Sequence, residues 1–180
     1  MKRLVIVVLS LFVGLHMSAQ NLVYKTDNER EYEIGVKPEQ AKNLGVALSH
    51  SLDKTNGASR WTIIFNVIGW ETPFNFDKGS ILLIRTCGGS VLKLYQVLDC
   101  HDVLLPSKHD DIVGRLYRAQ PRFNISQEEL DILINEGIKK LRFDSTAGFM
   151  DYAHEHDYIG TILKKQKKII IAESDFNRGY

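Results

Sequence analysis

The sequence lacks the short motifs that mark three common classes of enzyme. It has no G-x-S-x-G nucleophile elbow, and its C-G-G-S segment lacks the length and the following lysine of a phosphate-binding loop. Its histidines do not follow the H-E-x-x-H spacing of helical zinc proteases. Acidic residues are abundant, but their spacing alone identifies no glycosidase pair. We therefore assign no catalytic residue, expect no cofactor, and lean toward a protein that is not an enzyme.

The sequence also lacks an excess of basic residues. The full chain has 23 Lys and Arg residues against 22 Asp and Glu, and without Lys2 and Arg3 the balance becomes 21 against 22. Proteins that bind nucleic acid through its phosphates normally carry a basic excess. Nucleic acid is therefore not an expected partner.

No hydrophobic run is long enough to cross a membrane. Residues 4–15 are almost entirely apolar, but a spanning helix needs about 20 such residues. Lys2 and Arg3 precede the run and Ala19 offers a small residue for cleavage, as in a secretory signal peptide. A retained membrane anchor is the alternative. We predict that residues 1–19 are a removed signal peptide, and that the exported chain, periplasmic or extracellular, keeps no transmembrane segment.

Cysteine is scarce, because Cys87 and Cys100 are the only two. Export permits a disulfide, but its two Cα atoms must lie within about 7 Å. Cys87 falls at a predicted hairpin turn, so a bridge to Cys100 requires the chain to fold back after Tyr95. Both states stay open, and the geometry favours free thiols. No cysteine directly follows the apolar run, which excludes a lipid-modified N-terminus.

Residues 20–44 are polar and are expected to form a partly ordered lead-in, with one helical turn near residues 38–42. Strand patterns follow in a single domain, residues 45–180. In residues 80–86, Ile81 and Leu83 point to one side and Leu82 and Ile84 to the other. A strand with one wet face would alternate apolar with polar residues. We therefore expect this strand, and likewise residues 60–70, to be covered on both faces. The other predicted strands are 46–52, 90–95, 111–124 and 138–144.

Two helices are predicted. Ser126 and Glu129 form a capping box at the start of the first, and Gly137 is expected to end it in the left-handed conformation. The second, from about residue 156 to 173, has an apolar stripe opposite four lysines; a strand at 168–173 is the competing interpretation. The predicted fold is α+β, an antiparallel-dominated sheet of about six strands with the short capped helix and the C-terminal amphipathic helix packed on it. The strand before and the strand after the capped helix could form a parallel crossover.

These segments carry a resemblance. The pattern SILLIRTCGGSVLKL, then FNISQEELDILINEGIKKLRF, then DYIGTILKKQKK is similar to small exported proteins of Bacteroidetes that contain a domain of unknown function. The resemblance covers roughly residues 61–168 and implies location and fold. It carries over no catalytic residue, because every matched residue has a folding role. In this family context, Asp144-Ser145-Thr146 resembles a site of O-glycosylation, with Ser145 as the acceptor.

The remaining candidates are weak. His101, His109, His154 and His156 lie in irregular stretches and could together hold a metal ion, although their spacings match no closed metal motif. The leading hypothesis is a non-enzymatic module that binds a protein or glycan at the cell envelope. The alternatives are a metal-assisted hydrolase that uses the loop histidines, or an inhibitor-like structural domain.

Overall fold

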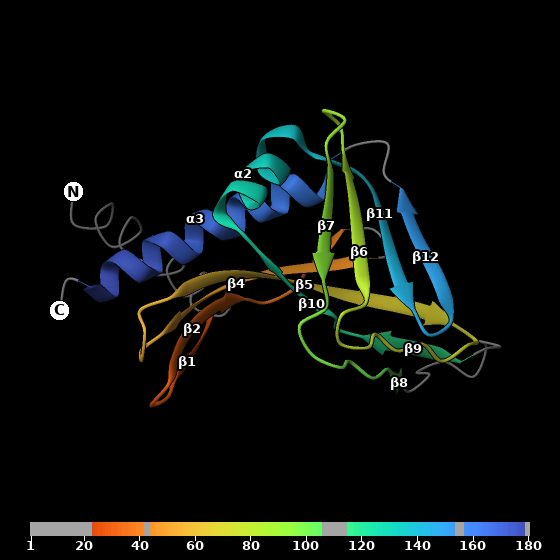
Figure 1. The fold of residues 1–180 in the computed structure, drawn as a ribbon, viewed down its shortest axis with the longest axis horizontal. Coiled ribbons are helices and arrows are strands. Elements are labelled where there is room, and N and C mark those ends of the chain that lie inside the picture. The colour runs from red at the N-terminus through yellow and green to blue at the C-terminus, as the bar shows by residue number, and fades with distance from the viewer. Residues whose placement is uncertain (1–22, 42–43, 106–114, 154–156, 179–180) are drawn as a thin grey trace, which may run out of the picture.

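A computed structural model describes residues 23–41, 44–105, 115–153 and 157–178. These residues form two antiparallel sheets and two helices (Figure 1). The strands are β1 (Val23–Asp27), β2 (Glu31–Val36), β3 (Glu39–Ala41), β4 (Leu44–Asp53), β5 (Ser59–Trp70), β6 (Ile81–Thr86), β7 (Val91–Tyr95), β8 (Val103–Leu105), β9 (Leu116–Ala119), β10 (Arg122–Ile125), β11 (Ile138–Ser145) and β12 (Gly148–Ala153). The helices are α2 (Gln127–Glu136) and α3 (Ile159–Arg178).

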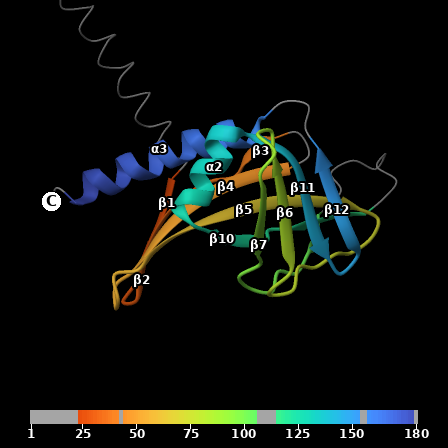
Figure 2. The same ribbon diagram turned by 45° about the horizontal axis from the view of Figure 1, so that its top comes forward.

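The larger sheet has eight strands, in the order β1-β2-β4-β5-β9-β8, with β10 paired to β5 and β3 paired to β4. The smaller sheet has the order β12-β11-β6-β7. Both helices and the smaller sheet lie over the larger sheet, with α3 running along β2 and β4 (Figures 1 and 2). Chain pairing is antiparallel throughout the described strands.

A cluster of aromatic rings holds the two sheets together. Phe143 of β11 packs edge-on against Phe65 of β5, with ring centroids 5.2 Å apart, and lies 6.1 Å from the ring of Phe123 in β10. All three side chains are 1% exposed or less. Edge-to-face pairs of this kind contribute about 0.5–1.5 kcal/mol beyond the area that they bury. The smaller sheet is therefore fixed to the larger one through its inner face.

The α+β prediction is confirmed, with antiparallel sheet and a C-terminal helix packed on it. The terminal segment is helical from Ile159 and not a strand at 168–173. In place of one sheet of about six strands, the structure has two. The predicted parallel crossover is wrong, because β10 and β11 belong to different sheets and α2 connects them.

The helical turn expected near residues 38–42 is wrong, because Glu39–Ala41 form β3, and the described part of the lead-in also contains β1 and β2. In β2, Tyr32, Ile34 and Val36 alternate with Glu31 and Glu33, and Ile34 and Val36 are buried. The charged residues occupy only one side of the strand, so the overall polarity concealed a half-buried pattern. The predicted signal peptide lies outside the described residues.

The start of α2 is as predicted. The backbone N–H of Glu129 donates to Ser126 Oγ at 3.2 Å, and the N–H of Ser126 donates to Glu129 Oε2 at 2.9 Å, which completes the capping box. The end differs from the prediction. Gly137 has φ 75° and ψ 164°, a region that is essentially restricted to glycine but is not left-handed helical. Its N–H still donates to Leu133 O at 3.1 Å.

Candidate binding surface

The smaller sheet turns one face away from the rest of the molecule. Strand registers place alternate residues of all four strands on this side, which we call the outer face. From β12 to β7 its members are Phe149 and Asp151, Lys140, Arg142 and Asp144, Ile81, Leu83 and Arg85, and Val91, Lys93 and Tyr95. The intervening residues, such as Leu82 and Phe143, are buried on the inner face.

The apolar side chains of the outer face are exposed. Phe149 is 71% exposed, Val91 64%, Tyr95 54% and Leu83 37%. The prediction that residues 80–86 are covered on both sides is therefore wrong. The hydrophobic pattern of β6 was read correctly, but only Leu82 and Ile84 belong to the core. Exposed apolar side chains gathered on one face of a sheet mark a candidate interaction site.

Charged residues alternate with the apolar ones across the outer face. Arg142 donates two hydrogen bonds to Asp151, at 2.7 and 2.8 Å, and Lys140 Nζ lies 2.9 Å from the same carboxylate. These bonds hold the pKa of Asp151 well below its usual range. Among the described residues, Arg85 and Lys93 form no ion pair. The face therefore carries four cations against two carboxylates, one of which is already paired.

Two cation–π contacts orient the aromatic side chains at the edges of the face. The guanidinium of Arg142 lies 5.3 Å from the centroid of the Phe149 ring, and Lys93 Nζ lies 5.3 Å from that of Tyr95. Such contacts within about 6 Å are worth roughly 0.5–1 kcal/mol at exposed sites. They reduce the rotamer freedom of Phe149 and Tyr95 before any partner arrives, which lowers the entropic cost of binding.

Two side-chain hydrogen bonds join the β6–β7 hairpin to the last residue of α2. Thr86 Oγ1 donates to Glu136 Oε2 at 2.5 Å, and Ser90 Oγ donates to Glu136 Oε1 at 3.0 Å. A Cβ on Gly88 would lie 2.6 Å from Glu136 Oε2, so the turn passes directly over this carboxylate. The outer face is thus held on a rigid support at the end where Arg85 and Val91 lie.

The structure describes only one of the four candidate metal ligands. His109, His154 and His156 lie outside the described residues, and His101 is an exposed residue between β7 and β8. Within the described ranges, no group of three or more His, Cys, Asp or Glu side chains is arranged to hold a metal ion. The metal site stays a prediction.

Cys87 and Cys100 are free thiols in the structure. Cys87 follows β6 at the hairpin turn, while Cys100 lies past the opposite end of β7, where its backbone pairs with Phe76. The hairpin separates them by roughly 20 Å at about 3.3 Å per residue. Partial burial raises the pKa of the Cys100 thiol.

The predicted glycosylation acceptor is enclosed. Ser145 is 9% exposed, and its hydroxyl donates to the carbonyl oxygen of Gly148 at 2.7 Å in the β11–β12 turn. Thr146 beside it is exposed, but its Oγ1 accepts a hydrogen bond from the N–H of Asn75 at 2.9 Å. Attachment of a sugar to Ser145 would require this turn to open.

No protein-family model, no curated protein and no solved structure matches the sequence. Among the described helices, none combines the length and apolar character needed to span a bilayer. The outer face is the feature that the sequence interpretation missed. Its signal was the pair of apolar residues Ile81 and Leu83 beside Arg85, a cation that an enclosed strand would not accommodate without a partner.

Proposed function

We propose that the protein is a non-enzymatic, exported module of the cell envelope that binds a protein partner through its outer face. The observation that supports the proposal is the joint exposure of Leu83, Tyr95 and Phe149 on one face of the smaller sheet, interleaved with cations. Export rests on the sequence of residues 1–19 alone.

The composition of the outer face is that of a protein interface. Aromatic residues and arginine are enriched at interface centres, where they supply large contact areas at low entropic cost. One row of laterally paired residues crosses the four strands of the smaller sheet. Phe149 lies at one end of this row, Tyr95 lies at the other, and Ile81 lies between them. Leu83 and Arg85 follow in the next two rows along β6. A flat partner surface can contact all of these side chains at once.

The charges specify the partner further. Arg85 and Lys93 are exposed and form no ion pair within the part of the chain that the structure describes, whereas Asp151 is paired with Arg142 and Lys140. The unpaired charge on this face is therefore mainly positive. A partner surface with apolar side chains and a few carboxylates complements it in both respects, and the opposite charges would also accelerate association.

The test is a photo-crosslinking amino acid at Leu83, with Lys168 on the exposed side of α3 as the matched position. We expect a protein adduct from Leu83 in envelope extract and none from Lys168. The purified partner should then bind at least about tenfold more weakly to Arg85→Glu than to Lys168→Glu, two variants with the same change in net charge.

Two outcomes would contradict the proposal. The first is a polysaccharide adduct at Leu83, which would indicate a glycan receptor. The second is equal affinity of the two charge-reversed variants, which would place the contact elsewhere. Thermal unfolding followed by circular dichroism checks that both variants are folded.

A further inference from the structure

The smaller sheet ends at β12, whose only strand partner among the described residues is β11. The turn between these strands has two residues and is closed by the hydrogen-bonded pair Ser145 and Gly148. Hydrogen bonds to β11 therefore come from Gly148 and from every second residue after it. The backbone N–H and C=O groups of Phe149, Asp151 and Ala153 point away from β11, and no described backbone group pairs with them. Strand β12 is thus an open edge, visible at the margin of the smaller sheet in Figure 1.

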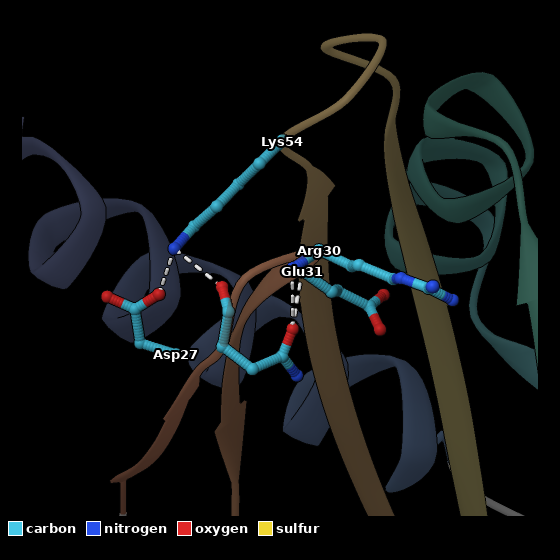
Figure 3. A network of polar contacts seen from close by, with 5 residues as sticks. Asp27, Arg30, Glu31 and Lys54 are labelled. Atoms are coloured by element: carbon cyan, nitrogen blue, oxygen red, sulfur yellow. Dashed lines mark hydrogen bonds and ion pairs between the residues drawn. The ribbon is translucent and has the colours of Figure 1, made fainter.

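The ends of the two sheets other than β12 are shielded. Strand β8 has only three residues, and β7 has Lys93 at its centre. Strand β1 has Lys25 at its centre, where it pairs with Glu173 of α3. Asp27 at the end of the same strand pairs with Lys54 (Figure 3). Short length and a central lysine are two common ways in which natural proteins prevent an edge strand from pairing with another chain.

Strand β12 has neither form of protection. It is six residues long, contains no lysine or proline, and keeps an uninterrupted register with β11. Its central charge belongs to Asp151, which accepts two hydrogen bonds from Arg142, its direct pair on β11. The carboxylate is therefore drawn toward β11 and does not extend past the edge. An open edge of this length is a template for one more strand.

The inner side of β12 favours apolar side chains in such a strand. Met150 and Tyr152 point to this side, where they are partly buried against the core of the protein. A strand added to the edge places every second side chain beside these two residues. Apolar side chains at those positions would cover the exposed parts of Met150 and Tyr152, which is favourable by about 25 cal/mol per Å² of apolar surface removed from water.

The outer side of β12 favours a carboxylate at one position. Ala153 is exposed, and its direct pair on β11 is Lys140, whose ammonium lies 2.9 Å from the carboxylate of Asp151. Because the methyl group of Ala153 is short, a glutamate opposite it can extend over this residue toward Lys140. Lys140 and Arg142 together carry two positive charges against the one negative charge of Asp151, so the remaining charge complements a second carboxylate.

We propose that an extended segment of the partner protein adds to β12 as an antiparallel strand, with apolar side chains beside Met150 and Tyr152 and a carboxylate near Lys140. This mode of binding rests on the proposed function, because the added strand extends the outer face that binds the partner. A second copy of this chain fits less well. The register that pairs all three open residues of two copies sets Asp151 opposite Asp151, and like charges in that position are destabilising. The occupant is therefore a different chain.

The probe is the peptide acetyl-Glu-Val-Thr-Val-Phe-amide, titrated into the purified, isotope-labelled protein and followed by two-dimensional amide NMR. In the proposed register its glutamate lies opposite Ala153 and its phenylalanine lies opposite Phe149. We expect saturable shifts and slower hydrogen exchange at the amides of Phe149, Asp151 and Ala153. N-methylation of the peptide threonine, whose N–H faces β12, should abolish binding. N-methylation of the second valine, whose N–H faces away from β12, should leave binding intact.

A pair of substitutions at Ala153 tests the same edge from the side of the protein. Ala153→Pro removes one open N–H and places a ring at the edge, without removing a hydrogen bond to β11. Ala153→Ser keeps the N–H and is the matched variant. We expect the proline variant to bind the peptide at least about tenfold more weakly than the serine variant. Unchanged dispersion of the NMR spectra shows that both variants are folded.

Strand addition is overturned if millimolar peptide causes no saturable shift at the three open amides, or if the two N-methylated peptides bind equally. Equal binding by Ala153→Pro and Ala153→Ser overturns it as well, and so does protection of these amides by dimerisation of the protein alone. The purified partner separates this inference from the proposed function. A partner weakened by Arg85→Glu but not by Ala153→Pro binds the outer face without adding a strand, whereas the opposite result contradicts the outer face and supports the edge.

Discussion

The side chain of Asp157 lies directly against the Cα of Gly137, so that a Cβ at this glycine would come within 2.9 Å of it. Asp157 Oδ1 accepts from the N–H of Ile138 at 2.9 Å and from the N–H of Gly160 at 2.8 Å. One carboxylate therefore joins the end of α2, the first residue of β11 and the first turn of α3. The contact therefore ties the smaller sheet, to which β11 belongs, to both helices.

Replacing Gly137 with alanine should destabilise the fold strongly. The residue has φ 75° and ψ 164°, which only glycine adopts readily, and the new methyl group would also collide with Asp157. We expect a loss of at least about 2 kcal/mol in the free energy of unfolding, measured by urea denaturation. Gly148→Ala is the control, because Gly148 has φ 102° but open space around its Cα. A loss as large in Gly148→Ala as in Gly137→Ala would mean that the contact with Asp157 contributes nothing.

Asp157 should matter as a hydrogen-bond acceptor more than as a charge. Asp157→Ala leaves the N–H groups of Ile138 and Gly160 without their acceptor, and we expect a loss of about 1–3 kcal/mol in the free energy of unfolding. Asp157→Asn keeps one carbonyl oxygen at the same place, so it should retain most of the stability. Hydrogen exchange at the two amides provides the site-specific measurement. Equal losses in the alanine and asparagine variants would contradict an acceptor role.

The sequence predicts α2 well and the contact between Gly137 and Asp157 not at all, for a physical reason. Ser126, Glu129 and Gly137 act on residues three or four positions away, so their chemistry is visible in a short stretch of sequence. Asp157 acts on Ile138, 19 positions earlier, through the tertiary fold. The same limit applies to Glu136, whose partners Thr86 and Ser90 are 50 and 46 positions away.

The outer face was missed for a different reason. An apolar side chain that is exposed for contact with a partner and one that is buried in the core follow the same local sequence pattern. Leu83, which is exposed, and Leu82, which is buried, therefore cannot be told apart from sequence. Strand β12 is not predicted, because Gly148 and the polar residues before it indicate only a turn at residues 145–149. Gln166 shows the opposite case: its spacing puts this polar residue on the apolar stripe of the last helix, and its side chain is fully buried with its amide donating to Val46 O at 3.0 Å.

Glu136 should make stability depend on acidic pH. The hydrogen bond from Thr86, followed by that from Ser90, lowers the pKa of Glu136 below its ordinary value. The unfolded chain therefore takes up this proton first as the pH falls. The stabilisation is fully present above the ordinary glutamate pKa and is lost as the pH falls through the lower, folded value.

The measurement is the free energy of unfolding of the wild type and Glu136→Gln between pH 7 and pH 3. We expect the wild type to be more stable at pH 7 and this advantage to shrink steadily in acid. Thr86→Val should weaken the same dependence, because it removes the shorter of the two hydrogen bonds to Glu136. A constant difference between wild type and Glu136→Gln at all pH values would show that the carboxylate is not selectively stabilised in the folded state.

The two cysteines should react with alkylating agents at very different rates. The thiolate is the nucleophile, and partial burial raises the pKa of Cys100, whose sulfur also accepts from the N–H of Gln120 at 3.2 Å. Cys87 is exposed at the tip of the β6–β7 hairpin. With iodoacetamide at neutral pH and no reductant, intact-mass analysis should show one rapid addition, absent in Cys87→Ser, and a second that becomes rapid only in urea. A protein that accepts no label until it is reduced would instead contain a disulfide, which would contradict the free thiols of the structure.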